Sequence, residues 1–286
     1  MIETSVRFGP KDHLAGVIRD SSPWRRDANL FDQERVGVVM LTAGMLPSSG
    51  PYRLHVDLAG ALARLGLPSV RFDLSGIGES FSGPDPSASS LQRAVNETVS
   101  AMDLLEARTC SQRFILYGLC SGADDAMQVA LSDPRVVGLV TIDGFGYRTL
   151  GYHARRWFRD LPRKAMTQQF WRRRWRHWRG ADELPPSLRG GEDVREYPSR
   201  ATTCNHLRRL VRRGVSMHFA YTGGIRETIN HAGQFDSMFP EFIHERRITH
   251  RFFESMDHTA MLKRDRDVLM RHLVEQIAHT AVASNS

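Results

Sequence analysis

A cysteine flanked by glycines stands where an apolar run meets a helix-forming stretch. Residues 114–117 read Phe-Ile-Leu-Tyr, typical of a buried strand, and residues 123–131 have the composition of a helix. Residues 118–122, between them, read Gly-Leu-Cys-Ser-Gly. A nucleophile on such a sharp strand-to-helix turn needs glycine two positions away on each side, because larger side chains would collide. Only Cys120 has glycine at both positions, whereas Ser121 would have leucine and alanine. The spacing therefore predicts Cys120 as a thiol nucleophile.

A thiol nucleophile needs a base to handle its proton, and His258 is the predicted base. It follows directly on the last predicted strand, residues 248–253, and it precedes the closing helix at residues 269–281. The alternative reading is a surface loop histidine. Asp257 lies next to His258, and we expect its side chain to point away from the base or to support the loop.

The base in turn needs a carboxylate that orients it. Glu227 lies a few residues past the predicted strand 215–221, and Asp143 ends the strand before it. Glu227 is the preferred acid and Asp143 the alternative, with Asp236 as a poorer third candidate. Each of these carboxylates has a structural reading as well, as a turn residue or a solvated loop charge.

Two backbone N–H groups are predicted to stabilise the negative oxygen that forms when a thiol attacks a carbonyl group. The first is that of Ser121, directly after the nucleophile. The second lies in the loop 42–47, which follows the buried strand 36–41, and it is assigned to Met45, with Gly44 letting the backbone approach. The alternative is that this loop is a plain strand-to-helix turn.

Strand-like runs alternate with helical patterns along most of the chain, which predicts an α/β fold with a mostly parallel sheet and helices on both faces. The predicted strands are residues 2–8, 14–18, 36–41, 69–74, 114–117, 136–142, 215–221 and 248–253. In such sheets functional sites lie at the carboxyl ends of the strands. Met45, Cys120 and Asp143 all fall at such ends.

The alternation breaks between residues 147 and 212, where arginine and tryptophan are frequent. We interpret this segment as an inserted helical cap between two parts of one core, residues 1–146 and 213–286. Trp171, Trp175 and Trp178 fall on one helical face. They are predicted either to line an acyl pocket or, equally, to pack on the core with the neighbouring arginines in water.

Much of the net charge of +7 comes from residues 155–179, which hold nine arginines and one lysine against a single aspartate. Such a surface would attract an anionic partner. The phosphates of coenzyme A or an acidic acyl carrier protein would fit, whereas an anionic membrane surface is a less favoured partner. Nucleic acid is excluded because no binding motif accompanies the charge. The sequence gives no indication of oligomeric state.

Composition places further bounds on the chain. No apolar run is long enough to span a bilayer, and the first residues show no signal-peptide pattern. The three cysteines are an odd number, which favours free thiols and a reducing compartment, so we expect a cytoplasmic location. No metal-binding motif is present, and no cofactor is expected.

Four segments together resemble the α/β-hydrolase superfamily over nearly the whole chain. They are residues 36–45, the turn 73–80 (Asp-Leu-Ser-Gly-Ile-Gly-Glu-Ser), the segment around Cys120, and His258. The resemblance is closest to the serine-aminopeptidase-like branch, which includes hydrolases associated with exosortase systems. It implies the α/β-hydrolase fold and acyl chemistry, but it does not support peptidase activity. Most members have serine at the position of Cys120, while dienelactone hydrolases and polyhydroxyalkanoate synthases have cysteine.

The expected function is therefore that of an acyl-group hydrolase, either an esterase or a thioesterase, or of an acyltransferase that forms an acyl-cysteine intermediate. A thioester is attacked by amines, thiols and carbanions more readily than an oxygen ester, which favours transfer or thioester substrates. Two alternatives remain. One is a catalytically silent hydrolase fold that serves as a binding module, and the other is a thioester-dependent condensing or polymerising enzyme, which would need an acceptor.

Overall fold

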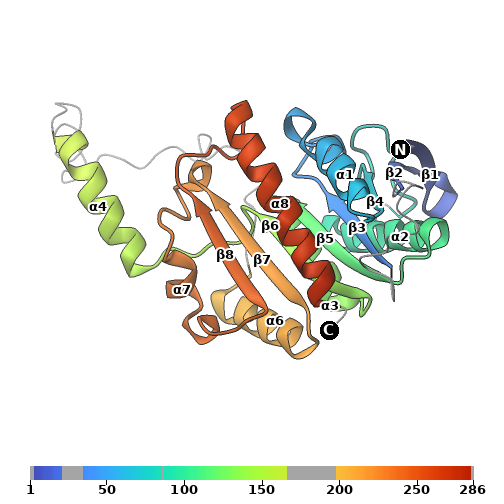
Figure 1. The fold of residues 1–286 in the computed structure, drawn as a ribbon. Helices are drawn as coiled ribbons and strands as arrows, with labels where there is room; N and C mark the ends of the chain where they lie inside the picture. Colours follow the sequence, from blue (N-terminus) through green and yellow to red (C-terminus); the bar gives the residue numbers. More distant parts are fainter. Residues whose placement is uncertain (1–2, 21–34, 86, 166–197, 285–286) are drawn as a thin grey trace.

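The computed structural model describes residues 3–20, 35–85, 87–165 and 198–284. One eight-stranded sheet forms the centre of this part of the chain, with the strand order β1-β2-β4-β3-β5-β6-β7-β8 (Figure 1). The first two strands pair antiparallel and β2 is antiparallel to β4, whereas β4, β3 and the strands beyond run parallel. The strands are β1 (Glu3–Phe8), β2 (Leu14–Arg19), β3 (Val36–Leu41), β4 (Ser69–Phe72), β5 (Arg113–Leu119), β6 (Val136–Ile142), β7 (Ser216–Thr222) and β8 (Ile248–Phe253).

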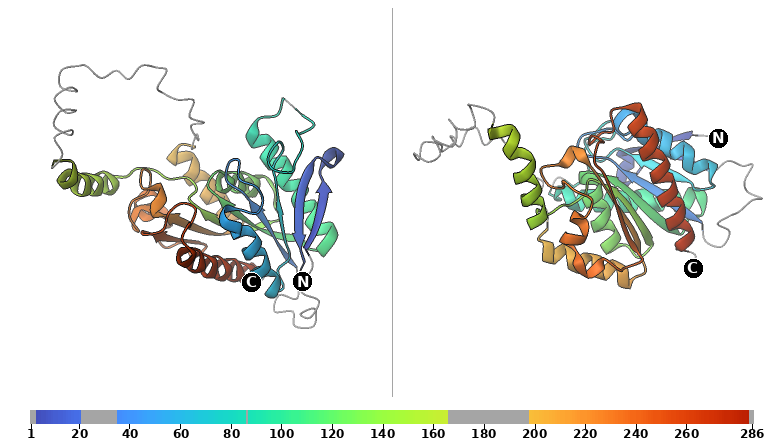
Figure 2. Two further views of the ribbon diagram at one scale, coloured as in Figure 1. Left: turned by 90° about the horizontal axis from the view of Figure 1, so that it is seen from above. Right: turned by 60° about the vertical axis from the view of Figure 1, so that its left-hand side comes forward.

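Helices cover both faces of this sheet (Figures 1 and 2). On one face α1 packs beside α8, and on the other α3 packs against both α2 and α6. The α-helices in the described residues are α1 (Leu54–Arg64), α2 (Ser90–Thr109), α3 (Ser121–Ser132), α4 (Leu150–Ala165), α6 (Arg200–Arg212), α7 (Gln234–Met238) and α8 (Lys263–Ala283). Single 3₁₀ turns lie at Pro10–Asp12 (η1), Pro51–Arg53 (η3), Gly223–Ile225 (η5) and Pro240–Phe242 (η6).

The central strands are apolar on both sides because helices bury both of their faces. Every residue of β3 is buried, and its side chains alternate between two clusters. Val39 and Leu41 contact the cluster beneath α2 and α3, while Val38 and Met40 contact the one beneath α1 and α8. Two apolar layers therefore hold β3 and β5 at the centre of the molecule. The strand-to-helix turn at residues 118–122, called the elbow below, begins at the end of β5.

The predicted mostly parallel sheet between two helical layers is confirmed. The division into residues 1–146, 147–212 and 213–286 stays a prediction, because most of the predicted cap lies outside the described residues. At the cap's two ends, α4 begins at Leu150, and α6 packs on the core through Leu207 and Leu210. No helix in the described part of the chain combines the length and the apolar character needed to cross a membrane.

Candidate active site

The turn between β5 and α3 has the strained geometry that the sequence predicts for a nucleophile. Cys120 has φ +55° and ψ −118°, a conformation that L-residues rarely adopt. A side chain at Gly118 would collide with the carbonyl oxygen of Gly122, and a Cβ at Gly122 would lie 2.5 Å from the carbonyl oxygen of Thr42. Both glycines are therefore required for this turn to lie against β3. The half-buried thiol stands at the N-terminus of α3.

His258 reaches this thiol from the loop after β8. Its Nδ1 lies 2.6 Å from Oδ2 of Asp143, and its other ring nitrogen is left for the hydrogen bond with Cys120. The bond to the Asp143 carboxylate, followed by the bond to Cys120, raises the pKa of His258 to about 10, against the opposing effect of burial. A pKa raised in this way favours the protonated ring, and a positive charge beside Cys120 favours the thiolate form of that residue.

Asp143 is completely buried directly after β6 and has a positive φ of 51°. Its carboxylate accepts two hydrogen bonds from Thr222 at the end of β7, from the backbone N–H at 2.7 Å and from the hydroxyl at 2.6 Å. Since β6 and β7 are neighbours in the sheet, this pair is a direct result of strand order. Sequence reasoning missed Thr222, although a threonine at the end of a predicted strand was a visible signal.

The preference for Glu227 as the partner of His258 was wrong, because Asp143 takes that place. The side chain of Glu227 is exposed, and its backbone carbonyl accepts hydrogen bonds from Arg148 and Tyr152 instead. The physical reason is that the chain turns into η5 straight after β7, which carries Glu227 beyond the strand end.

Two other acidic residues near the predicted triad have different partners. Asp236 on α7 is 2.8 Å from Nε2 of His250 on β8, so it does not serve His258. Asp257 accepts hydrogen bonds from Thr259 and from the backbone N–H of Met261. It therefore supports the loop that carries His258, one of the two roles expected for it.

Two glycines after Thr222 let the histidine loop approach β7. A side chain at Gly223 would meet the carbonyl oxygen of Glu254, and one at Gly224 would collide with the backbone of His258. The glycine pair is visible in the sequence, but the reason for it is not. Its role is to leave room for the loop that carries His258, some thirty residues further along the chain.

The loop predicted to supply the second oxyanion donor lies against the elbow. The backbone N–H of Gly44 donates to Oγ of Ser121 at 2.7 Å, and the N–H of Leu46 donates to the carbonyl of Ala43 at 2.9 Å. These bonds hold Met45 at the turn beside Ser121, with 86% of the Met45 side chain exposed. The donor roles of the Met45 and Ser121 N–H groups stay predictions, and Gly44 already has a partner for its own N–H.

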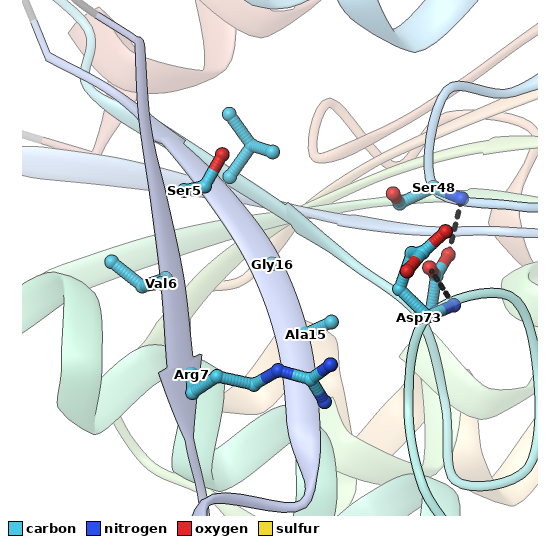
Figure 3. A pocket seen from close by; sticks show the side chains of 9 residues that line it. Ser5, Val6, Arg7, Ala15, Gly16, Ser48 and Asp73 are labelled. Carbon is cyan, nitrogen blue, oxygen red and sulfur yellow. Dashed lines mark hydrogen bonds between the residues drawn. The ribbon is translucent and has the colours of Figure 1, made fainter.

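Asp73, directly after β4, anchors the chain at the end of this loop. Its carboxylate accepts from the N–H of Ser48 at 2.5 Å and from that of Glu79 at 3.0 Å (Figure 3). Asp73 also lines a pocket of about 440 Å³ that opens beside β1 and β2 and does not include Cys120 or His258. The turn at residues 73–80 therefore has a structural role, because it fixes the chain at Ser48, directly after the loop 42–47.

The tryptophans predicted to bind substrate, Trp171, Trp175 and Trp178, lie outside the described residues. Within the described ranges, no group of three or more His, Cys, Asp or Glu side chains could hold a metal ion.

Comparison with known proteins gives structural matches only. A scan of protein-family models and a search of curated proteins both find no match. Among solved structures, an esterase from Pyrococcus furiosus matches with a TM-score of 0.59 and 10% identity, over 98% of this chain and 91% of that one. The α/β hydrolase GrgF from a Penicillium species matches with a TM-score of 0.56 and 16% identity, over 99% and 100%.

Mouse α/β hydrolase domain-containing protein 10 matches with a TM-score of 0.54 and 14% identity, over 96% of this chain and 99% of that one. Identities this low carry no detail of substrate or mechanism, but coverage of nearly the whole chain on both sides establishes the architecture. Together with the sheet order and the elbow after β5, these matches show that the chain has the α/β-hydrolase fold.

Proposed function

We propose that this protein is an acyl-group hydrolase or acyltransferase that acts on an ester or thioester through an acyl-cysteine intermediate. The observation that carries the proposal is the arrangement of Cys120, His258 and Asp143. The strained Cys120 contacts His258, which has a raised pKa and is itself bound to the fully buried carboxylate of Asp143. Such an arrangement is costly to build and suits covalent catalysis rather than a silent binding module.

In the acylation step the Cys120 sulfur attacks the carbonyl carbon, and the π electrons of the carbonyl group move to its oxygen. The N–H groups of Ser121 and Met45 stabilise that oxyanion. When the carbonyl double bond re-forms, the bond to the leaving group breaks. His258 gives its proton to the departing oxygen or sulfur, which leaves as an alcohol or a thiol.

In the second step neutral His258 takes a proton from water or from an acceptor as that molecule attacks the thioester carbon. The acceptor receives the acyl group, and Cys120 leaves as a thiolate beside the re-protonated histidine. A thioester intermediate lasts long enough for amines and thiols to compete with water, which supports transfer as an alternative to hydrolysis. The choice between the two depends on which acceptor the site admits.

Intact-protein mass after incubation with short and medium acyl thioesters and esters tests the proposal. The wild type is expected to gain the mass of one acyl group, and Cys120→Ala is expected to gain none. Because Cys110 and Cys204 are also free thiols, Cys110→Ala/Cys204→Ala is the matched control and should still be acylated. A wild type that gains no mass and forms no product, or an acylated Cys120→Ala variant, would contradict the proposal.

We further propose that the acyl group arrives on an anionic carrier, either coenzyme A or an acyl carrier protein. The charge of residues 155–179 supports this. If it is correct, kcat/KM for an acyl-coenzyme A should exceed that for the same acyl group on N-acetylcysteamine, and added salt should remove the difference.

The free cysteines support a reducing, cytoplasmic location, and the turn at residues 73–80 supports membership of the serine-aminopeptidase-like branch.

A further inference from the structure

The helix α4 presents large apolar side chains to solvent. Leu150 is 91% exposed, Trp157 58% and Phe158 71%. Seven residues make almost two full helical turns, so Leu150 and Trp157 lie on one side of α4, with Phe158 next to them. Three such side chains on one face form an apolar patch, which soluble proteins rarely leave uncovered. We call it the α4 apolar face.

The helix is attached to the rest of the molecule by its opposite side. Tyr152 lies roughly 200° around the helix from Leu150, and only 1% of it is exposed. Its hydroxyl donates to the carbonyl oxygen of Glu227 at 2.7 Å, and its carbonyl accepts from the side chain of Asn230 at 3.1 Å. The side that packs is thus the polar one, and the apolar face points away from the core.

Positive charge borders the α4 apolar face. Arg155 and Arg156 are exposed between Tyr152 and Trp157, and Arg156 donates to the Tyr152 hydroxyl at 3.3 Å. In sequence, α4 carries four arginines and one lysine against one aspartate. Bulky apolar side chains beside an arginine-rich face are the pattern of helices that lie in the plane of a membrane interface, where anionic headgroups bind the cations.

We propose that α4 docks on the surface of an anionic lipid bilayer, with Leu150, Trp157 and Phe158 inserted at the level of the headgroups. Figures 1 and 2 show α4 at the side of the molecule, extending away from the sheet, where a flat surface can reach it. Its anchor at Glu227 belongs to the loop that follows Thr222, so docking holds the candidate active site close to the lipid. The proposal does not depend on the acyl chemistry of that site.

Flotation with vesicles tests the proposal directly. The probes are vesicles of phosphatidylcholine alone and of phosphatidylcholine with phosphatidylglycerol. Wild-type protein is expected to float with the anionic vesicles and much less with the neutral ones. Trp157→Ser/Phe158→Ser should weaken binding about tenfold or more, and Arg155→Glu should weaken it about fivefold or more in low salt only. The matched control is Leu91→Ser/Ile243→Ser, two exposed apolar residues elsewhere, which should bind like the wild type.

Thermal unfolding of each variant provides a readout that is independent of both lipid and catalysis. An unchanged melting temperature for Trp157→Ser/Phe158→Ser supports an uncovered face, whereas a marked loss would mean that the chain itself covers it and would overturn the proposal. Equal binding to neutral and anionic vesicles, or none to either, would also overturn it. So would wild-type affinity in the Trp157→Ser/Phe158→Ser variant.

Discussion

At the scale of single residues, the raised pKa of His258 suits a thiol nucleophile better than a serine hydroxyl. A serine hydroxyl needs a neutral histidine to remove its proton, whereas a thiol can exist as a thiolate beside an imidazolium. The pKa of His258, raised to about 10 chiefly by Asp143, favours the second state. Cysteine at the elbow and a buried carboxylate behind the histidine are therefore parts of one electrostatic arrangement.

Substitution of Asp143 is expected to remove the charge that keeps His258 protonated. In Asp143→Asn the pKa of His258 should fall towards 6.5, and the thiolate at Cys120 should lose its partner. Alkylation of Cys120 by iodoacetamide at pH 6, measured in a Cys110→Ala/Cys204→Ala background, should then slow by about tenfold or more. Glu227→Gln is the matched control and should alkylate at the parent rate, since Glu227 is exposed and has no contact with His258. The opposite ranking of the two variants would restore Glu227 as the acid.

The backbone strain at Cys120 predicts a conflict between stability and activity. Glycine adopts positive φ freely, so Cys120→Gly should be more stable than Cys120→Ala by about 1–3 kcal/mol while losing all activity. At Cys204, inside α6, the same comparison should give the reverse order by about 1 kcal/mol, because glycine is a poor helix former. Urea unfolding of the four variants measures both differences. Equal stability of the two Cys120 variants would show that the turn stores no strain.

At the scale of elements, the candidate site forms where the ends of β5, β6 and β7 meet the loop after β8. The elbow was predictable because everything it needs lies within five residues, Gly118 to Gly122. The partner of His258 was not predictable, because the sequence alone does not distinguish the carboxylate of Asp143 from that of Glu227. The choice depends on Thr222, which lies beside Asp143 only in the folded sheet. Likewise His258 was found from its place after a strand, but the need for Gly224 appears only when the two loops meet.

The contact between these loops predicts the effect of adding one methyl group. Gly224→Ala would place a Cβ against the backbone of His258, so the histidine should shift away from Cys120 and kcat should fall by about tenfold or more. Gly60→Ala in α1 is the matched control, because its nearest neighbour would lie 3.7 Å away. Alanine there should stabilise the fold by about 0.5–1 kcal/mol and leave the rate unchanged. Full activity in Gly224→Ala would show that the loops can separate without cost.

At the scale of the whole molecule, histidines set how stability varies with pH. His218 on β7 and His272 on α8 are both buried, and their Nε2 atoms are 2.8 Å apart. Arg251 donates to Nδ1 of His272, so His272 donates from Nε2 to His218, and Nδ1 of His218 is left to donate to Thr249. This chain of hydrogen bonds requires both rings to be neutral. Burial, followed by the electrostatic effect of His272, His250 and Arg251 on a protonated ring, lowers the pKa of His218 to about 3.

Acid should therefore destabilise the fold through this histidine pair. The folded pKa values lie below the unfolded value of about 6.5, so the unfolded chain binds more protons, and stability is complete above that pH and falls as the pH drops towards 3. His258 acts in the opposite sense, since its raised pKa contributes stability below pH 6.5 that is lost as the pH rises towards 10. Stability should consequently be greatest near neutral pH.

Urea unfolding between pH 4.5 and 7.5 measures the acid side of this dependence. Each buried histidine can contribute up to about 1.4 kcal/mol per pH unit to the slope of the unfolding free energy against pH. His218→Gln keeps hydrogen-bonding groups but does not titrate. This variant should be less stable than the wild type at pH 7 and yet lose less stability towards pH 5. His279 is an exposed histidine on α8, the helix that carries His272, and His279→Gln should keep the wild-type slope of stability against pH. If His218→Gln has the wild-type slope as well, another group takes up the proton that destabilises the fold. That group would be the fully buried His55, whose pKa is lowered by burial to about 4.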